Sequence, residues 1–378
     1  MADRSGASPL ALLCVHPNGE LYGSDRVFIQ SVQAFRDRWP DARITILLPV
    51  EGPLARLLRE KEPDVRIVPL NVLRRAKLGR TIANMARLPL DMMRARRQMA
   101  AYDLSYISTV VVLDYILATR LSRTPSLIHL HELPTGKEGL VFSGILTWSK
   151  ARLLCISAAV RDAFAGLRGR DMPIIWNGAP DRVVQPQDDG DGTLHILLIG
   201  RFNAWKGQGL LVDAVARLTP EERARLRIRI VGSVYEGQEH FETDIYERIA
   251  RHGLSDCITV SGFVPVPDAH YDWAHIVAVP STKPEPFGLV AIEGMAAGRA
   301  VIAAGHGGLA EIVDDGATGT LVVPGEADSL ADAIRAYIAD PSLAARHGAA
   351  GRVRFESCFR EDIYQRKLAD VAEQEMGR

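Results

Sequence analysis

The chain has 378 residues, of which 47% are hydrophobic and 24% are charged, and its net charge at pH 7 is −1. These values are typical of an ordinary globular protein with about two domains. No stretch reaches the roughly 18 apolar residues of a membrane span. The four cysteines are scattered without a Cys-x-x-Cys pair, which excludes a zinc site and a disulfide framework of the usual spacing.

The charge divides unevenly along the chain. Residues 1–192 carry a balance of +6, and residues 193–378 carry a balance of −7. The two halves are therefore expected to meet different partners, and the basic half could meet nucleic acid, anionic lipid or a phosphorylated acceptor. The amino terminus does not resemble a secretory signal, so a cytoplasmic location is expected.

Short apolar runs that alternate with helix-like stretches predict the strands of the first half. These runs lie at residues 10–15, 43–49, 65–70, 104–108, 126–131, 153–156 and 174–176. Amphipathic stretches at residues 25–39 and 113–121 predict helices between them. The second half restarts the pattern with runs at residues 194–199, 227–231, 258–261, 276–279, 300–303 and 320–323.

Continuous apolar runs indicate strands covered on both faces, and hence parallel sheets flanked by helices. We therefore predict an α/β protein with two doubly wound, Rossmann-like domains facing a central cleft. The expected parts are an acceptor domain at residues 1–180, a Gly-, Pro- and Asp-rich linker at 181–193, a donor domain at 194–357, and a C-terminal helix at 358–378 that packs back toward the first domain.

Two segments of the second half predict an anion site. Arg201 and Lys206 lie in the glycine-bounded loop that follows the strand at 194–199. A strand end, a glycine turn and a helix start favour phosphate, to which both cations would be attracted. A surface loop with two solvated cations is the alternative.

The second segment is Pro280–Glu293, which follows a buried strand and opens an apolar helix. Pro286 suits the first helical turn, so Phe287, Gly288 and Leu289 would present free amides. Glu285 and Glu293 could hold sugar hydroxyl groups. The alternative is a helix-capping Glu285 and a solvated Glu293.

The order and spacing of these motifs resemble family 4 of the retaining glycosyltransferases, which have the GT-B fold. The motifs are Gly-Arg-x4-Lys-Gly at 200–207, Glu-x7-Glu at 285–293, and the glycine-rich stretch 307–319. The resemblance is strong over residues 193–355 and looser over residues 1–180. It implies a hexosyltransferase of bacterial surface polysaccharide, lipopolysaccharide or glycolipid synthesis.

The resemblance also implies roles for individual residues. Arg201 and Lys206 would bind the donor diphosphate, Glu285 the sugar, and Glu293 the ribose. The amides of Phe287, Gly288 and Leu289 would approach the sugar and phosphates. The nucleobase would lie in the loop Gly262, Phe263 and Val264. No divalent metal or other cofactor is expected, and the substrates would be a nucleotide sugar and a glycan or polyprenyl-linked lipid acceptor.

The first half contributes two further candidates. The stretch 16–26 resembles the family's glycine-rich loop, which would bring Gly23 to the donor phosphate, with Ser24 as the helix N-cap. Tyr22 stands where the family has a glycine, so the fit is looser and Tyr22 could line the acceptor site instead. His131 follows a buried strand and is paired with Glu132; by resemblance it lies beside the donor sugar and acts in catalysis. The alternative is a hydrogen-bonded structural histidine.

The mechanism implied by the resemblance is front-face retention, in which the leaving phosphate takes the acceptor proton. A hydrolase pair is disfavoured because both glutamates lie on the donor side. A nucleotide-sugar epimerase of similar fold and a non-catalytic nucleotide-sugar-binding protein are the competing interpretations.

Residues 73–97 carry eight basic residues and one acidic residue, Asp91. A basic amphipathic helix of this kind predicts peripheral contact with an anionic membrane, and Pro89 would kink or split it. An ordinary helix packed on the sheet is the alternative. Nucleic-acid binding is not expected, because interleaved aromatic residues are lacking.

Overall fold

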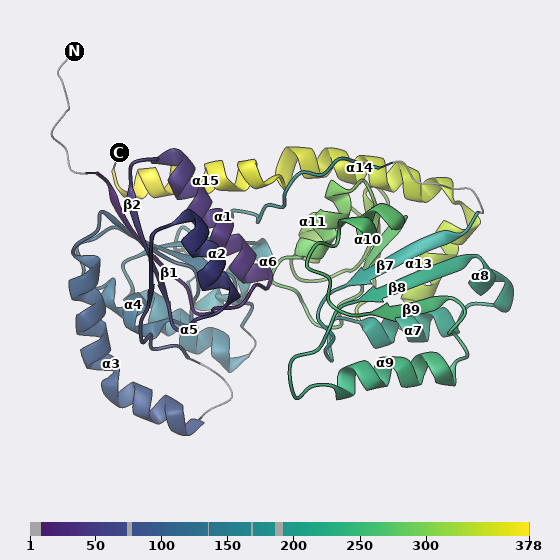
Figure 1. Cartoon of the computed structure of the whole chain (residues 1–378), viewed down its shortest axis with the longest axis horizontal. Helices are drawn as coiled ribbons and strands as arrows, with labels where there is room; N and C mark the ends of the chain where they lie inside the picture. Colours follow the sequence, from purple (N-terminus) through teal and green to yellow (C-terminus); the bar gives the residue numbers. More distant parts are fainter. Residues whose placement is uncertain (1–8, 74–77, 135, 168, 186–191, 378) are drawn as a thin grey trace, which may run out of the picture. The chain divides into compact units, whose positions relative to one another are not determined.

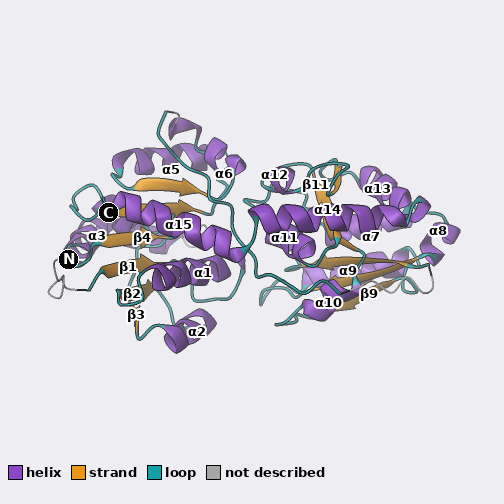
Figure 2. Ribbon diagram, turned by 90° about the horizontal axis from the view of Figure 1, so that it is seen from above, coloured by secondary structure: helices purple, strands orange, loops and turns teal. Residues whose placement is uncertain are grey.

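The computed structural model describes residues 9–73, 78–134, 136–167, 169–185 and 192–377. The chain folds into two compact units. The first comprises Met1–Asn177 and Asp362–Arg378, and the second comprises Gly178–Glu361. Each unit contains one six-stranded sheet with helices on both faces (Figures 1 and 2).

The sheet of the first unit is parallel throughout, with the strand order β3-β2-β1-β4-β5-β6. Its strands are Ala11–Val15 (β1), Arg43–Leu48 (β2), Asp64–Ile67 (β3), Leu104–Ile107 (β4), Ser126–Leu130 (β5) and Arg152–Cys155 (β6). The order reverses between β1 and β4, where the crossovers pass to opposite sides. Side chains that follow the carboxyl ends of these strands therefore gather at one edge.

The last helix of the first unit comes from the C-terminal end of the chain. Ser31 on α1 hydrogen-bonds through Oγ to the hydroxyl groups of Tyr364 on α15 (2.6 Å) and Tyr106 on β4 (3.0 Å). The helices of this unit are Gly23–Arg38 (α1), Pro53–Lys61 (α2), Leu78–Met99 (α3), Leu113–Ala118 (α4), Lys137–Trp148 (α5), Ala158–Ala163 (α6) and Glu361–Glu375 (α15), with a 3-10 turn at Ala165–Leu167.

The second unit repeats the plan with the parallel order β12-β11-β10-β7-β8-β9. Its strands are Leu194–Ile199 (β7), Leu226–Val231 (β8), Ile258–Ser261 (β9), Ile276–Val279 (β10), Ala300–Ala304 (β11) and Gly319–Val322 (β12). Its helices are Gln208–Ala216 (α7), Pro220–Ala224 (α8), His240–Arg251 (α9), Asp268–Trp273 (α10), Leu289–Ala296 (α11), Leu309–Ile312 (α12), Ala327–Ala339 (α13) and Ser342–Cys358 (α14).

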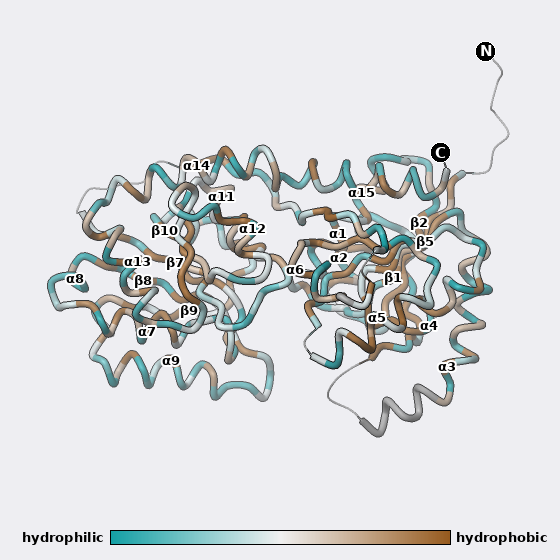
Figure 3. Tube along the Cα trace, turned by 180° about the vertical axis from the view of Figure 1, so that it is seen from behind, coloured by the Kyte–Doolittle hydropathy of each residue, from teal (hydrophilic) through white to brown (hydrophobic). Residues whose placement is uncertain are grey.

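The prediction of doubly wound α/β units is confirmed by both sheets. The central strands of both sheets are mostly buried, and the Cα trace in Figure 3 is brown, hydrophobic, along β1 and β7. The strand expected at residues 174–176 is wrong. Only Ile174 forms an isolated bridge with Cys155, because the chain leaves the sheet after the amide of Ile175 bonds the Cys155 carbonyl oxygen.

The basic segment forms one helix, α3, which Pro89 does not split. Residues 74–77 of the predicted segment lie outside the described residues, and so do the side chains of residues 78–85. Among the helices that the structure describes, none is both long and apolar enough to cross a membrane.

The close packing of α14 on β11 generates a stability prediction. An added Cβ at Gly348 would lie 2.2 Å from the carbonyl oxygen of Gly298, whereas at Gly351 it would meet the flexible Met295 side chain at 3.3 Å. We expect Gly348→Ala to lower the free energy of unfolding by about 1–3 kcal/mol, because rigid backbone must move.

Gly351→Ala on the same helix is the matched control, and it should change stability by less than about 1 kcal/mol, since helix propensity favours alanine. Chemical denaturation of both variants measures the difference. Equal losses of stability in the two variants would show that the close approach of the Gly298 backbone does not require glycine at residue 348.

Candidate functional site

The loop between β7 and α7 places Lys206 at the carboxyl edge of the second sheet. The side-chain oxygen of Asn203 accepts hydrogen bonds from the amides of Trp205 (3.0 Å) and Lys206 (2.9 Å), which closes a tight turn. The Trp205 carbonyl oxygen in turn accepts the amide of Thr282 at 2.7 Å. The two segments predicted from the sequence are thus joined through their backbones.

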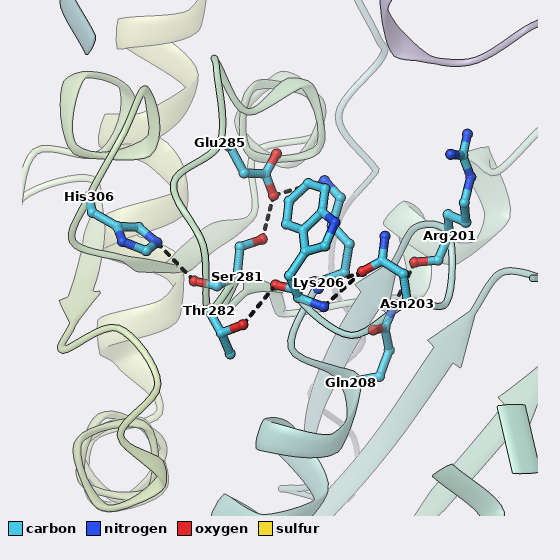
Figure 4. Close-up of polar contacts among 9 residues, drawn as sticks. Arg201, Asn203, Lys206, Gln208, Ser281, Thr282, Glu285 and His306 are labelled. Atoms are coloured by element: carbon cyan, nitrogen blue, oxygen red, sulfur yellow. Dashed lines mark hydrogen bonds and ion pairs between the residues drawn. The ribbon is translucent and has the colours of Figure 1, made fainter. Parts of the chain in front are cut away.

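A partly buried ion pair occupies the junction of these segments (Figure 4). Lys206 Nζ lies 2.8 Å from Glu285 Oε1, and the hydroxyl group of Ser281 donates to the same oxygen. Glu285 is only 6% exposed. A carboxylate with so little water requires such partners, because an unpaired buried charge is strongly destabilising.

The loop before α12 supports this carboxylate from the other side. Its Gly308 amide donates to the Glu285 carbonyl oxygen at 2.8 Å, and His306 Nε2 donates to the Ser281 carbonyl oxygen at 2.9 Å. Gly307 has φ +60°, and a Cβ there would lie 2.5 Å from the Glu285 carbonyl oxygen. Glycine at 307 therefore allows the loop to press against the Glu285 backbone.

The helix that follows Glu285 begins later than the sequence predicts. α11 starts at Leu289 with Gly288 as its N-cap, so Pro286 lies before the helix and not in its first turn. Among the described residues, the amides of Phe287, Gly288 and Leu289 make no backbone hydrogen bond. Three neighbouring donors and a helix amino terminus remain available to an anion.

Glu293 lies on α11 and is half-buried. Its Oε2 atom accepts a hydrogen bond of 2.5 Å from the hydroxyl group of Tyr271, whose side chain is buried. The Tyr271 ring is covered by the guanidinium group of Arg182, 4.7 Å from the ring centroid. One carboxylate oxygen of Glu293 is thus fixed by the protein.

The remaining predicted residues of the second unit are more exposed. Arg201 points away from Glu285 in Figure 4, and its guanidinium carbon lies 3.6 Å from the centroid of the Tyr235 ring. Gly262 and Phe263 are exposed and Val264 is half-buried in the loop after β9. A stacked arginine keeps its hydrogen-bonding edge while the ring limits its motion.

In the first unit, the loop after β1 is held by Asp25. Its Oδ1 atom lies 2.7 Å from His16 Nε2, and its Oδ2 atom accepts the Tyr22 amide at 2.8 Å. The expected N-cap at Ser24 is wrong: α1 begins at Gly23 and Tyr22 is the N-cap, because Asp25 in the first turn satisfies the Tyr22 amide.

His131 and Glu132 follow β5 at the same edge of that sheet. The His129 and His131 rings lie on one side of the strand, with centroids 4.4 Å apart. His129 Nδ1 bonds the Tyr106 hydroxyl group at 2.9 Å, whereas His131 Nε2 has no hydrogen-bond partner among the described residues. Glu132 accepts from the Thr109 hydroxyl group and from the amides of Val110 and His131.

Burial dominates the ionisation of these groups. It lowers the pKa of His129 to about 3 and the pKa of His131 well below its usual value, and the neighbouring His129 and His16 lower the pKa of His131 further. Burial raises the pKa of Glu132, although its hydrogen bonds oppose the shift. His131 is therefore a neutral imidazole at physiological pH and suits hydrogen bonding better than charge compensation.

The structure thus gathers Lys206, Glu285 and the three amides in the second unit, and Tyr22, Gly23 and His131 at the edge of the first sheet. Sequence reasoning assigned no role to Ser281, His306, Tyr271, Tyr235 or Asp25. Only Asp25 carried a usable signal, as an acidic residue in the first turn of the helix predicted at residues 25–39. In the described part of the chain, no three His, Cys, Asp or Glu side chains are placed to hold a metal ion.

The second unit is similar to a known protein family. Residues 184–354 match glycosyl transferases group 1. The chain is 31% identical over 279 residues to a D-inositol 3-phosphate glycosyltransferase of Streptomyces avermitilis, across 72% of this chain and 54% of the relative. It is 32% identical over 196 residues to a lipopolysaccharide 1,2-N-acetylglucosaminetransferase of Salmonella typhimurium, across 49% and 50%. The chain therefore spans about half the length of these relatives.

Solved structures extend the likeness to the whole fold. Anabaena Alr3699/HepE, crystallised with UDP and glucose, matches with a TM-score of 0.80 at 24% identity, over 97% of this chain and all of that one. The sucrose-phosphate synthase of Thermosynechococcus elongatus matches with a TM-score of 0.78 at 21% identity, over 97% of this chain and 99% of that one. These matches confirm the GT-B fold class expected from the sequence.

The buried histidines generate a prediction about pH. A histidine whose pKa falls on folding contributes stability above its unfolded pKa of about 6.5, and this contribution is lost as the pH falls toward the folded value. His129→Asn keeps an acceptor for Tyr106 but cannot titrate. We expect wild type to lose about 2 kcal/mol relative to this variant between pH 7 and pH 5.

Chemical denaturation of both proteins at several pH values, monitored by hydrogen exchange in β5, measures the difference in their free energies of unfolding. His252→Asn is a control, because His252 is exposed and lies in the second unit. A constant difference between wild type and His129→Asn across this pH range would contradict the assignment of a neutral His129.

Proposed function

We propose that this chain is a retaining glycosyltransferase that moves a hexose from a nucleoside-diphosphate sugar to a hydroxyl group of a glycan or lipid-linked acceptor. The observation that carries the proposal is the Lys206–Glu285 pair beside the free amides of residues 287–289. This arrangement lies within the segment that matches glycosyl transferases group 1.

Each part of the donor has a chemical counterpart in the second unit. Lys206, Arg201 and the amides of residues 287–289 supply positive charge and donors for the diphosphate. Glu285 offers its Oε2 atom to sugar hydroxyl groups while Lys206 and Ser281 hold Oε1. Glu293 offers Oε1 to the ribose while Tyr271 holds Oε2.

The reaction breaks the bond between the anomeric carbon and the diphosphate oxygen, and the acceptor oxygen forms its bond on the same face. The acceptor proton passes to the departing phosphate oxygen, so no side chain must act as base. The cations stabilise the charge that develops on the leaving group. Glu285 is an unsuitable base in this scheme, since its carboxylate already pairs with a lysine.

The first unit is proposed to bind the acceptor at the carboxyl edge of its sheet through Tyr22 and Ser24, with Glu132 in a supporting role. His131 stays a prediction as the residue beside the donor sugar. Glu132 has both oxygens in use, so its contribution is to shape the loop at residues 109–111.

We also propose contact with an anionic membrane through α3. Arg87, Leu90, Arg94 and Arg97 recur at helical spacing and are all exposed. Leu90 is 75% exposed among these arginines. Apolar and basic side chains on one outward face suit the interface of an anionic bilayer.

The donor assignment predicts the behaviour of two variants. Lys206→Met and Glu285→Ala should each lower kcat/KM for transfer by about 100-fold or more, because each removes a group that meets charge or hydroxyls at the reacting centre. Initial rates with UDP-, GDP- and ADP-hexoses measure this, after thermal shift has selected the donor.

Lys283→Met is the matched control, since Lys283 is an exposed lysine of the loop that carries Glu285. It should retain transfer within about threefold. Wild-type rates in both site variants would refute the donor site. Isomerised donor without transfer would favour an epimerase instead.

The Lys206–Glu285 pair further predicts that Glu285 opposes diphosphate binding. The carboxylate competes for the lysine and repels the phosphates, so Glu285→Gln should bind UDP about five- to tenfold more tightly than wild type. Isothermal titration measures the affinity. Glu326→Gln removes one exposed carboxylate of the same unit and should leave the affinity unchanged. Equal or weaker binding by Glu285→Gln would contradict this antagonism.

A further inference from the structure

A cavity of about 790 Å³ opens at the amino edge of the first sheet, opposite the edge that carries His131. Tyr102 and Asp103, which precede β4, line it together with residues 121–125, which precede β5, and with the last turns of α3. Its volume is within the range of ligand pockets. None of the residues assigned to the proposed transfer reaction lines it.

Three arginines make this cavity strongly basic. Arg96, Arg97 and Arg123 line it, and Asp103 is its one acidic lining residue. Arg96 donates through Nε to the Leu121 carbonyl oxygen at 2.9 Å, which fixes its guanidinium group. Arg97 and Arg123 make no ion pair or side-chain hydrogen bond among the described residues. Such unneutralised guanidinium groups are suited to phosphate oxygens.

Exposed apolar side chains lie on or beside the segments that line the basic cavity. Leu121 lines it and is 41% exposed. The neighbouring Arg120 stacks on Trp148, which is 51% exposed, at 5.6 Å from the ring centroid. On α3, Leu90 and Met93 are exposed on the outward face that continues to Arg97. Exposed Leu and Trp beside arginines are typical of side chains that enter the headgroup region of a bilayer.

We infer that this cavity binds the phosphate of an anionic phospholipid headgroup, with Arg97 and Arg123 as its phosphate ligands and Arg96 as a fixed support. The inference rests on the proposed membrane contact, which would supply the lipid. It adds a specific headgroup site to the general electrostatic attraction between α3 and an anionic membrane. The lipid then docks the first unit through the edge of the sheet opposite the proposed acceptor site.

The test compares two double variants with equal loss of charge. Arg97→Gln with Arg123→Gln removes the phosphate ligands, whereas Arg56→Gln with Arg161→Gln removes exposed arginines of α2 and α6 that do not line the cavity. Flotation with phosphatidylglycerol and with phosphatidylcholine vesicles, at about 0.1 M and about 1 M salt, measures the affinity.

We expect wild type to bind phosphatidylglycerol vesicles at low salt, and the cavity variant to bind about 25-fold more weakly, since each arginine near an anionic surface contributes about fivefold. The control double variant should stay within about twofold of wild type. Equal weakening in both variants would overturn the site in favour of general surface charge.

A soluble ligand is distinguished by titration with glycerol 3-phosphate. Tight binding that depends on Arg97 and Arg123, together with vesicle binding that does not, would overturn the lipid assignment. Absence of vesicle binding by wild type would overturn both this site and the membrane contact. Titration of the same samples with UDP, GDP and ADP separates these outcomes from the donor site: failure of all three in wild type counts against the proposed transferase and not against the cavity.

Discussion

The second unit is organised around a carboxylate that has almost no access to water. Glu285 is tolerated there because Lys206 and Ser281 reach the same oxygen, and because the loops that carry these residues are joined through the Thr282 amide and the Gly308 amide. Removing one partner would leave a buried charge. The ion pair and these backbone contacts together hold three loops in one arrangement, and the arrangement presents unused amides at residues 287–289 beside a cation.

The carboxyl edge of the sheet in the first unit is built around buried histidines. His16, His129 and His131 are all buried, and burial lowers the pKa of each. Tyr106 joins His129 to Ser31 and hence to Tyr364 on α15. The C-terminal helix is thus connected by hydroxyl groups to the strand that precedes His131. The opposite edge of this sheet is basic and exposed, so one sheet separates an edge of buried histidines from an arginine-lined one.

The fold was predictable because buried parallel strands leave continuous apolar runs, and each of β7 to β12 lies within two residues of such a run. Sites at the ends of strands were also accessible, since Lys206 and Glu285 follow strands of one parallel sheet. The sequence could not show that Tyr271 bonds Glu293, because the two residues lie on separate helices, α10 and α11. It misplaced the start of α11, because proline favours a first turn but Gly288 with φ +140° sets the cap. It also missed the basic cavity, whose lining comes from three separated segments.

In the proposed reaction, the cations and the leaving diphosphate stabilise the developing charge, Glu285 is engaged by Lys206, and no side chain acts as base. The most direct test is the anomeric configuration of the glycosidic bond in the product, determined by proton NMR. With an α-linked nucleotide sugar as donor, front-face retention predicts an α-linked product. A β-linked product would require attack from the opposite face, assisted by a base, and would contradict it.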